Sequence, residues 1–148
     1  MLRMAVVGAG WMARVRVRAL IATGQVELCG VAARHTETAQ TMAREFSCEA
    51  GFDDYRQLVT THPDFLLVEV PHQVQDDVVL WGLEQGLHVF IGGTMATTTR
   101  VSKQIQSLVE AKKRVVESGY EARYNPAWEG ARDLIHSGAL GRLVTVRT

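Results

Sequence analysis

A glycine-rich turn with the sequence G-A-G-W-M-A occupies residues 8–13, directly after a short apolar run at the start of the chain. The run at residues 3–7 is typical of a buried strand, and apolar residues recur at helical spacing after the turn. In this pattern Gly8 permits the tight turn, Gly10 lets the backbone approach a pyrophosphate, and Ala13 allows the helix to pack closely on the sheet. The helix N-terminus adds N–H donors and the positive end of its dipole. The turn therefore predicts a dinucleotide site, with a glycine turn that serves packing alone and a methyltransferase-like sheet that binds a sulfonium nucleoside as alternatives.

Strand-like apolar runs alternate with segments of helical period along almost the whole chain. The expected strands lie near residues 3–7, 26–33, 48–51, 65–70, 87–91 and 114–117, with a strand-like tail at 143–148. Helical periodicity is found near residues 13–21, 39–46, 74–81, 101–109 and 127–135, with a short helix at 54–59. We expect Thr36 to cap the second helix and Gly138 to cap the last one. This alternation predicts an α/β fold with a mostly parallel, doubly wound sheet and right-handed crossovers.

The composition excludes several classes of protein. The chain has 148 residues, of which 47% are hydrophobic and 22% charged, as in an ordinary globular domain. Its 16 Lys and Arg cancel its 16 Asp and Glu, and a neutral chain is poorly suited to nucleic acid or a membrane surface. Cys29 and Cys48 form no paired motif, so we expect neither a disulfide framework nor a metal site. No apolar run approaches a signal-peptide core or a membrane span, so we expect a cytoplasmic protein.

The end of the second expected strand selects between the two nicotinamide cofactors. An NAD site usually places Asp or Glu there, about 20 residues beyond the glycines, to hold the ribose 2′-hydroxyl. This chain has Ala33, Arg34 and His35 instead. With no carboxylate to repel a 2′-phosphate and a guanidinium that can hold it through two hydrogen bonds, the sequence favours NADP. The alternative is that Arg34 is an exposed charge at a strand end, and the lone His35 is more simply an exposed side chain.

Several further motifs occur in a recognisable order. They are P-D at residues 63–64, V-P-H at 70–72, G-L-H-V-F at 86–90, M-A-T at 95–97, and G-Y and R-Y-N-P within 119–126. Together with the glycine-rich turn they resemble the glucose–fructose oxidoreductase/inositol dehydrogenase/rhizopine-catabolism (Gfo/Idh/MocA) family of nicotinamide-dependent oxidoreductases. The resemblance covers essentially all of residues 2–148. It implies a Rossmann domain at residues 1–120, followed at 121–148 by a linker helix and the first strand of a substrate domain.

The resemblance also assigns cofactor contacts to individual residues. By their place in the family's motifs, the residues that would contact the dinucleotide are Gly8, Gly10, Trp11, Met12, Ala13, Ala33, Arg34, Val70, Pro71, His72, Gln75, Gly92 and Arg123. The glycine-rich turn would cradle the pyrophosphate, and Arg34 would meet the adenosine phosphate. His72 stands where the family usually has Asn, Gln75 stands where His is common, and Arg123 would lie near the nicotinamide.

The largest departure from the family lies after the fifth expected strand. The family has Glu-Lys-Pro there, with Lys as its substrate-binding and proton-handling group, whereas this chain has Gly92, Gly93 and Thr94. When a hydride leaves a carbinol, a base must remove the hydroxyl proton, and such a base typically raises the rate by ~10²–10⁴-fold. Gly93 has no side chain that could act as this base. Thr94 is a poor base at neutral pH. We expect Lys103 and Lys112 on the solvated face of a helix, away from the site.

The catalytic residue is therefore unknown from the sequence. His72 is the strongest substitute, because it lies at the mouth of the expected cleft and imidazole titrates near neutrality, although a hydrogen-bonding loop residue is the simpler interpretation. Glu69 lies inside an apolar run and is either a strand-end carboxylate that faces the cleft or a group paired in the sheet. Tyr120 and Glu121 border the same region, with packing and surface roles as the simpler interpretation.

In the family, the substrate domain begins in the strand where this chain stops, at Thr148. We therefore expect the substrate pocket to lie outside this chain, and we expect the unpaired terminal strand to be able to pair with another copy in a homo-oligomer. The sequence predicts an NADP-binding domain, with NAD as the alternative cofactor, of an oxidoreductase that acts on a sugar, cyclitol or similar small alcohol or carbonyl compound. By itself such a domain would be inactive. The alternative is a non-catalytic nucleotide sensor or scaffold subunit.

Overall fold

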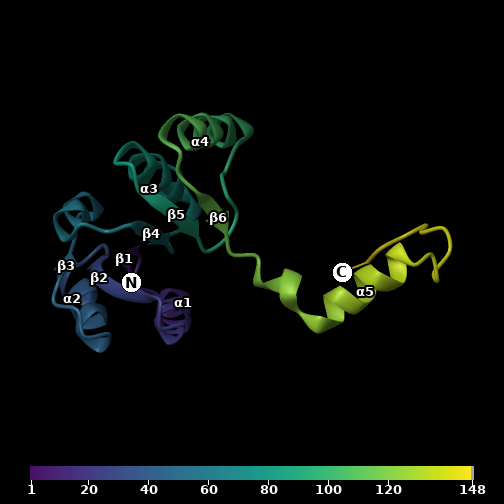
Figure 1. Ribbon diagram of the computed structural model, residues 1–148, viewed down its shortest axis with the longest axis horizontal. Helices are drawn as coiled ribbons and strands as arrows, with labels where there is room; N and C mark the ends of the chain where they lie inside the picture. The colour runs from purple at the N-terminus through teal and green to yellow at the C-terminus, as the bar shows by residue number, and fades with distance from the viewer. Residues whose placement is uncertain (148) are drawn as a thin grey trace.

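In the computed structural model, which describes residues 1–147, a parallel sheet lies between two layers of helices (Figure 1). The strands are β1 (Leu2–Val7), β2 (Val26–Ala32), β3 (Gly51–Phe52), β4 (Phe65–Val68), β5 (His88–Ile91) and β6 (Val116–Ser118). The α-helices are α1 (Trp11–Ala22), α2 (Thr36–Glu45), α3 (His72–Glu84), α4 (Thr99–Lys112) and α5 (Pro126–His136). Two 3₁₀ helices, η1 (Tyr55–Thr61) and η2 (Glu121–Tyr124), complete the described elements.

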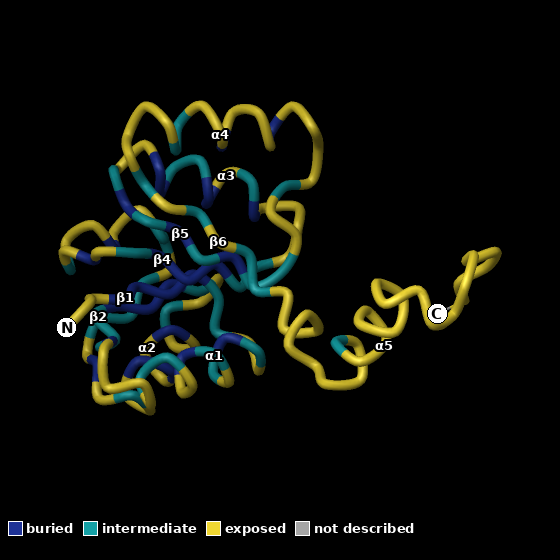
Figure 2. The backbone as a smooth tube through the Cα atoms, turned by 45° about the vertical axis from the view of Figure 1, so that its right-hand side comes forward, coloured by how far each residue is buried: buried dark blue, intermediate teal, exposed yellow. Residues whose placement is uncertain are grey.

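The sheet has the strand order β3-β2-β1-β4-β5-β6, and all of its strand pairs are parallel. The chain moves outward from β1 to β2 and β3, and then returns to β4 on the other side of β1. Figure 2 shows α1 and α2 on one face of the sheet and α3 and α4 on the other. In such a doubly wound sheet a crevice opens at the carboxyl ends of the strands where the order reverses. The predicted α/β Rossmann fold is confirmed, and its switch point lies beside β1.

The core consists of two apolar layers, one on each face of the sheet. Successive side chains of a strand point to opposite faces, and β1 is buried on both. Ala5 and Val7 pack into one layer, with β4, α3 and α4, while Met4 and Val6 pack into the other, with α1 and α2. All four of these side chains are buried. This double burial holds the glycine-rich turn, which follows Val7 directly, between the two layers.

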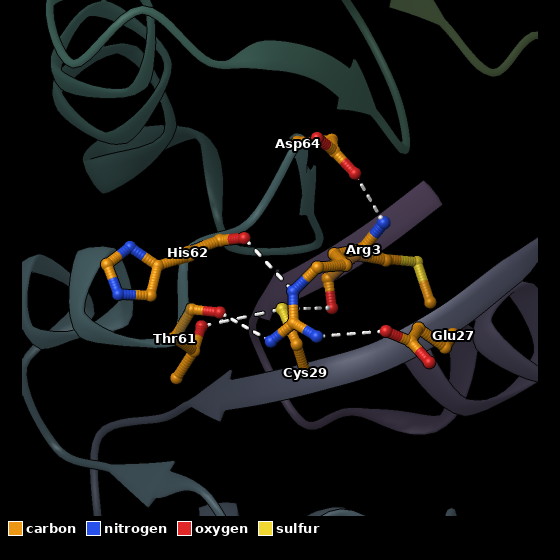
Figure 3. Close-up of polar contacts among 7 residues, drawn as sticks. Arg3, Glu27, Cys29, Thr61, His62 and Asp64 are labelled. Atoms are coloured by element: carbon orange, nitrogen blue, oxygen red, sulfur yellow. Dashed lines mark hydrogen bonds and ion pairs between the residues drawn. The ribbon is translucent and has the colours of Figure 1, made fainter. Parts of the chain in front are cut away.

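Arg3 lies at the amino-terminal ends of the strands, whereas the crevice opens at their carboxyl ends. Figure 3 shows its polar contacts. Its guanidinium pairs with Glu27 on β2 at 2.9 Å and donates to the carbonyl groups of Thr61, at 2.7 Å, and His62, at 3.1 Å. Its backbone N–H donates to the Asp64 carboxylate at 2.7 Å. The side chain of Arg3 thus joins β1, β2 and the segment before β4.

Several elements differ from their predicted bounds. β3 is a two-residue strand at Gly51–Phe52 rather than a strand at 48–51, β6 begins at Val116, and η1 is a 3₁₀ helix. β4 ends at Val68 rather than at residue 70, and Pro71 is the N-cap residue of α3. Thr36 does not cap α2, since it is the first helical residue and its hydroxyl donates to Asp53 at 2.9 Å.

The carboxyl-terminal segment projects away from the sheet (Figure 1). Residues 143–147 form neither helix nor strand, so the strand predicted at 143–148 is not found in the described residues, and Thr148 lies outside them. A strand forms only beside a partner, and no strand of the sheet is paired with this segment. Helix α5 buries none of its residues, and Trp128 and Leu134 are both more than half exposed. Within residues 1–147, no helix is both long and apolar enough to cross a membrane.

Candidate dinucleotide-binding site

A cavity of about 600 Å³ opens at the carboxyl ends of β1, β2 and β4, at the switch point of the sheet. Three short segments form most of its wall: the glycine-rich turn, the residues after β2 and the residues after β4. Six of the residues predicted to contact a cofactor line it, namely Gly8, Gly10, Ala33, Arg34, Val70 and Pro71. The fold therefore brings the predicted pyrophosphate turn and the predicted adenosine-side residues to one cavity.

The backbone of the turn combines a tightly packed glycine, open space and N–H groups without partners within residues 1–147. Gly8 has a φ of +110°, and a side chain there would overlap the carbonyl oxygen of Glu69. A Cβ at Gly10 would meet no protein atom within 4 Å, so the protein leaves the space beside it open. No hydrogen-bond partner is found among the described residues for the N–H groups of residues 11–13, and no acidic side chain lies in this first helical turn. Free N–H donors at a helix N-terminus fit a phosphate ligand.

Arg14 fixes the carbonyl side of the same turn. Its guanidinium donates to the carbonyl oxygens of Ala9 and Gly10, the latter at 3.4 Å, and pairs with Glu45 on α2 at 2.9 Å. The carbonyl groups of the turn are therefore held by the protein, whereas the N–H groups of the following helical turn remain free. This division of donors and acceptors leaves the turn suited to an anion.

The wall beyond β2 contains charges of both signs. Arg34 and His35 are exposed at the end of β2, and Asp53 and Tyr55 line the same cavity. From the sequence we expect no carboxylate at the end of β2, but the cavity wall that contains Arg34 also contains Asp53. The parallel pairing of β2 with β3 brings it there, because Phe52 is the register partner of Ala32. Sequence reasoning missed it because β3 is so short, although an acid directly after the strand that pairs with β2 was the available signal.

Glu69 lies at the end of a strand and lines the cavity, as one interpretation expected, and its carboxylate is paired with a residue of α1 rather than within the sheet. Glu69 follows β4, lines the cavity, and forms an ion pair of 2.5 Å with Arg16 on α1. Both side chains are largely buried, with exposed fractions of 10% and 13%. Arg16 also pairs with the exposed Glu121 on η2, at 3.2 Å. Burial raises the pKa of Glu69 above its ordinary value, and the neighbouring Arg16 opposes part of that rise.

His72 and Gln75 do not line this cavity within the described residues. Gln75 is buried and donates through Nε2 to the carbonyl oxygen of Thr94 at 2.7 Å, so its amide anchors the loop after β5. His72 is the first residue of α3, its Nδ1 lies 3.5 Å from the Thr94 hydroxyl, and it faces a separate cavity between α3 and α4. Both residues contact Thr94, in the loop after β5.

The remaining predicted contacts lie around the cavity rather than in its wall. Trp11 is 74% exposed at the start of α1, Met12 is half-buried, and Ala13 packs in the core beneath the turn. Arg123 lines a different cavity, of about 490 Å³, between α1 and residues 117–124. Gly92 lies against the Glu69 carboxylate, as described below.

Comparison with known proteins places this geometry in a family. The profile of an oxidoreductase family with an NAD-binding Rossmann fold (GFO/IDH/MocA) matches residues 2–120. The chain belongs to the GFO/IDH/MocA family. Residues 2–120 are accordingly an NAD(P)-binding Rossmann domain, in agreement with the resemblance of the sequence motifs.

Individual relatives in this family are distant. Levoglucosan dehydrogenase from Pseudarthrobacter phenanthrenivorans is 28% identical over 119 residues, which are 79% of this chain and 30% of the relative. Inositol 2-dehydrogenase 4 from Saccharopolyspora erythraea is 24% identical over 152 residues, 95% of this chain and 43% of the relative. The structure of myo-inositol 2-dehydrogenase from Lactobacillus plantarum superposes with a TM-score of 0.84 at 18% identity, covering 97% of this chain and 43% of that protein. The chain thus spans less than half the length of each of these relatives.

Proposed function

We propose that the chain is the NADP-binding domain of an oxidoreductase that acts on a sugar, cyclitol or similar small alcohol or carbonyl compound. The observation that carries the proposal is the single cavity that joins the glycine-rich turn to Arg34. Family membership supports the redox chemistry, and the names of the relatives, which are dehydrogenases of levoglucosan and inositol, support the substrate class. The bound cofactor would accept or donate the hydride.

In this proposal each segment of the cavity wall contacts a different part of the cofactor. The free N–H groups after Gly10 would bind the pyrophosphate, and Arg34 would hold the 2′-phosphate through two hydrogen bonds. Val70 and Pro71, which lie across β1 from Arg34, would pack against the other half of the dinucleotide. Asp53 opposes the preference for NADP, but its carboxylate already accepts a hydrogen bond from Thr36.

Residues 121–148 would begin a second, substrate-binding domain. Support comes from α5, which exposes Trp128, Leu134 and Ile135 and has no buried residue. An amphipathic helix with its apolar side chains exposed ordinarily packs on a partner surface. Free thiols at Cys29 and Cys48 fit the proposed cytoplasmic location.

A non-catalytic nucleotide sensor or scaffold subunit is the second candidate. The observation that favours it is Gly93, which stands where the family has its proton-handling Lys and has open space around it. Among the described residues, no side chain lies within 4 Å of the Cβ position at residue 93. Turnover of an alcohol or carbonyl substrate by a longer form of the protein would exclude this candidate.

The cofactor part of the proposal is tested by titrating NADPH and NADH into the purified chain and its Arg34→Ala variant. We expect NADPH to bind more tightly than NADH, and the variant to weaken NADPH by about tenfold or more with little change for NADH. The matched control is Arg18→Ala, which removes an exposed arginine of α1 outside the cavity. Equal losses for both cofactors in Arg34→Ala would contradict a contact with the 2′-phosphate.

A further inference from the structure

The buried carboxylate of Glu69 is not explained by the pyrophosphate turn or by the adenosine side of the site. It lies between the carboxyl ends of β4 and β5, in the wall of the dinucleotide cavity, and its partner Arg16 comes from α1. The backbone of Glu69 also supports the turn. Its N–H donates to the carbonyl of Val7 at 2.8 Å, and its own carbonyl lies against Gly8.

The absence of a side chain at Gly92 leaves room for this carboxylate. A Cβ built at position 92 would overlap Oε1, Oε2 and Cδ of Glu69, which means that the carboxylate occupies the volume of a side chain at residue 92. Arg16 pairs with the carboxylate in that place at 2.5 Å. The neighbouring Gly93 shows the contrast, since a Cβ there meets no atom within 4 Å. Only one of the two glycines is required by the packing of the strand ends.

The ion pair also matters for an anionic ligand. Glu69 is a lining residue of the cavity, where an unpaired carboxylate would repel an anionic ligand, and the guanidinium of Arg16 neutralises its charge at 2.5 Å. Arg16 lies on the helix whose first turn would bind the phosphates, so the pair connects that helix to the ends of β4 and β5. Removing Arg16 leaves the Glu69 charge largely buried without a partner, and removing Glu69 leaves Arg16 paired only with the exposed Glu121. Either change frees α1 to shift relative to β4.

We propose that Glu69 and Arg16 are a positioning pair for the dinucleotide, in which the carboxylate of the residue after β4 fills the place of a side chain at the residue after β5 and holds α1 in register with the cavity. The inference rests on the proposed dinucleotide binding. Neither residue takes part in chemistry. Their role is to keep the N–H donors of α1 and the wall after β4 at the separation that the ligand requires.

The test moves the carboxylate from one strand to the other. We expect Glu69→Ala to weaken NADPH binding about tenfold, and Gly92→Glu alone to weaken it at least as much, because two carboxylates then compete for one space. In the double variant Glu69→Ala/Gly92→Glu the carboxylate reaches Arg16 from β5, and most of the affinity returns. Calorimetric titration gives each dissociation constant, and thermal unfolding shows that each variant is folded at the titration temperature.

Arg18→Met is the matched control for Arg16→Met. Both residues lie on α1 and pair with a glutamate, but Arg18 is mostly exposed and its partner is Glu45 on α2. We expect Arg16→Met to weaken NADPH by tenfold or more and Arg18→Met to leave it unchanged. The proposal is overturned when folded Glu69→Ala and Arg16→Met bind like the wild type, or when the double variant binds no better than Glu69→Ala. Absence of binding to the wild type would instead reject the proposed function, and this inference with it.

Discussion

The backbone carbonyl of Glu69 lies where the first side-chain atom of a residue at position 8 would be placed, at the point where β4 passes beside the glycine-rich turn. Gly8 also has a φ of +110°, which L residues with a side chain rarely adopt. The first glycine of the motif is therefore required by the packing of two neighbouring strand ends. The second glycine, Gly10, is not, because a Cβ there meets open space.

This difference predicts opposite behaviour for two alanine variants of the turn. Gly8→Ala should lower the free energy of unfolding by about 1–3 kcal/mol and weaken NADPH binding, because the strain displaces the turn. Gly10→Ala should leave stability nearly unchanged and still weaken binding, because its methyl group occupies the approach of the pyrophosphate. Urea denaturation and NADPH titration measure the two effects separately. A Gly10→Ala variant with unaltered affinity for NADPH would show that the pyrophosphate does not lie close to this residue.

Arg34 and Asp53, which both line the cavity beyond β2, should shift the preference between NADPH and NADH in opposite directions. Asp53→Asn removes the carboxylate nearest the expected 2′-phosphate and keeps a side chain that can accept from Thr36. We expect this variant to bind NADPH more tightly relative to NADH, by about three- to tenfold, as measured by the ratio of the two dissociation constants. Glu37→Gln, an exposed acid on α2 outside the cavity wall, is the control and should not change the ratio.

The glycine-rich turn and Arg34 could be predicted from sequence because each follows a strand whose apolar pattern is strong. Asp53 and Tyr55 could not, because they reach the cavity only through the pairing of β2 with the two-residue β3. The interpretation of Glu69 stayed open for a related reason. An acid inside an apolar run does not reveal which helix supplies its partner, and Arg16 lies 53 positions away in the chain.

Substitutions at the two glycines after β5 should differ in their effect on stability. Gly92→Ala places a methyl group in the volume of the Glu69 carboxylate, so we expect a loss of about 1–3 kcal/mol in the free energy of unfolding. Gly93→Lys projects into open space and should change stability by no more than about 0.5 kcal/mol. Chemical denaturation of the two variants measures which of them loses more free energy of unfolding. A Gly93→Lys variant that unfolds more readily than Gly92→Ala would contradict the packing described here.

Removing Arg16 should make the stability of the protein depend more strongly on pH through Glu69. Burial raises the pKa of this carboxyl above its ordinary value of 4.5, and the loss of Arg16 should raise it further. A group with a raised pKa in the folded state stabilises it below the unfolded value and loses that contribution as pH rises through the folded value. Arg16 and Glu121 are the charged groups that act on the carboxyl, from α1 and η2. The deficit of Arg16→Met relative to the wild type should therefore be small near pH 4.5 and grow to about 3 kcal/mol towards neutral pH.

The double variant Arg16→Met/Glu69→Gln separates this effect from other titrations. With no carboxyl at residue 69, its deficit relative to the wild type should no longer increase between pH 4.5 and neutrality. Urea denaturation of the three proteins at a series of pH values gives the comparison. Parallel curves for the single and double variants would mean that Glu69 is not the titrating group.

A crystal structure of the chain with bound NADPH tests the central claim most directly. We predict that the pyrophosphate oxygens lie about 3 Å from backbone nitrogens at the start of α1, within residues 10–13, with the 2′-phosphate at Arg34. A nucleotide bound elsewhere on the protein, or a pyrophosphate that makes no contact with these nitrogens, would contradict the account.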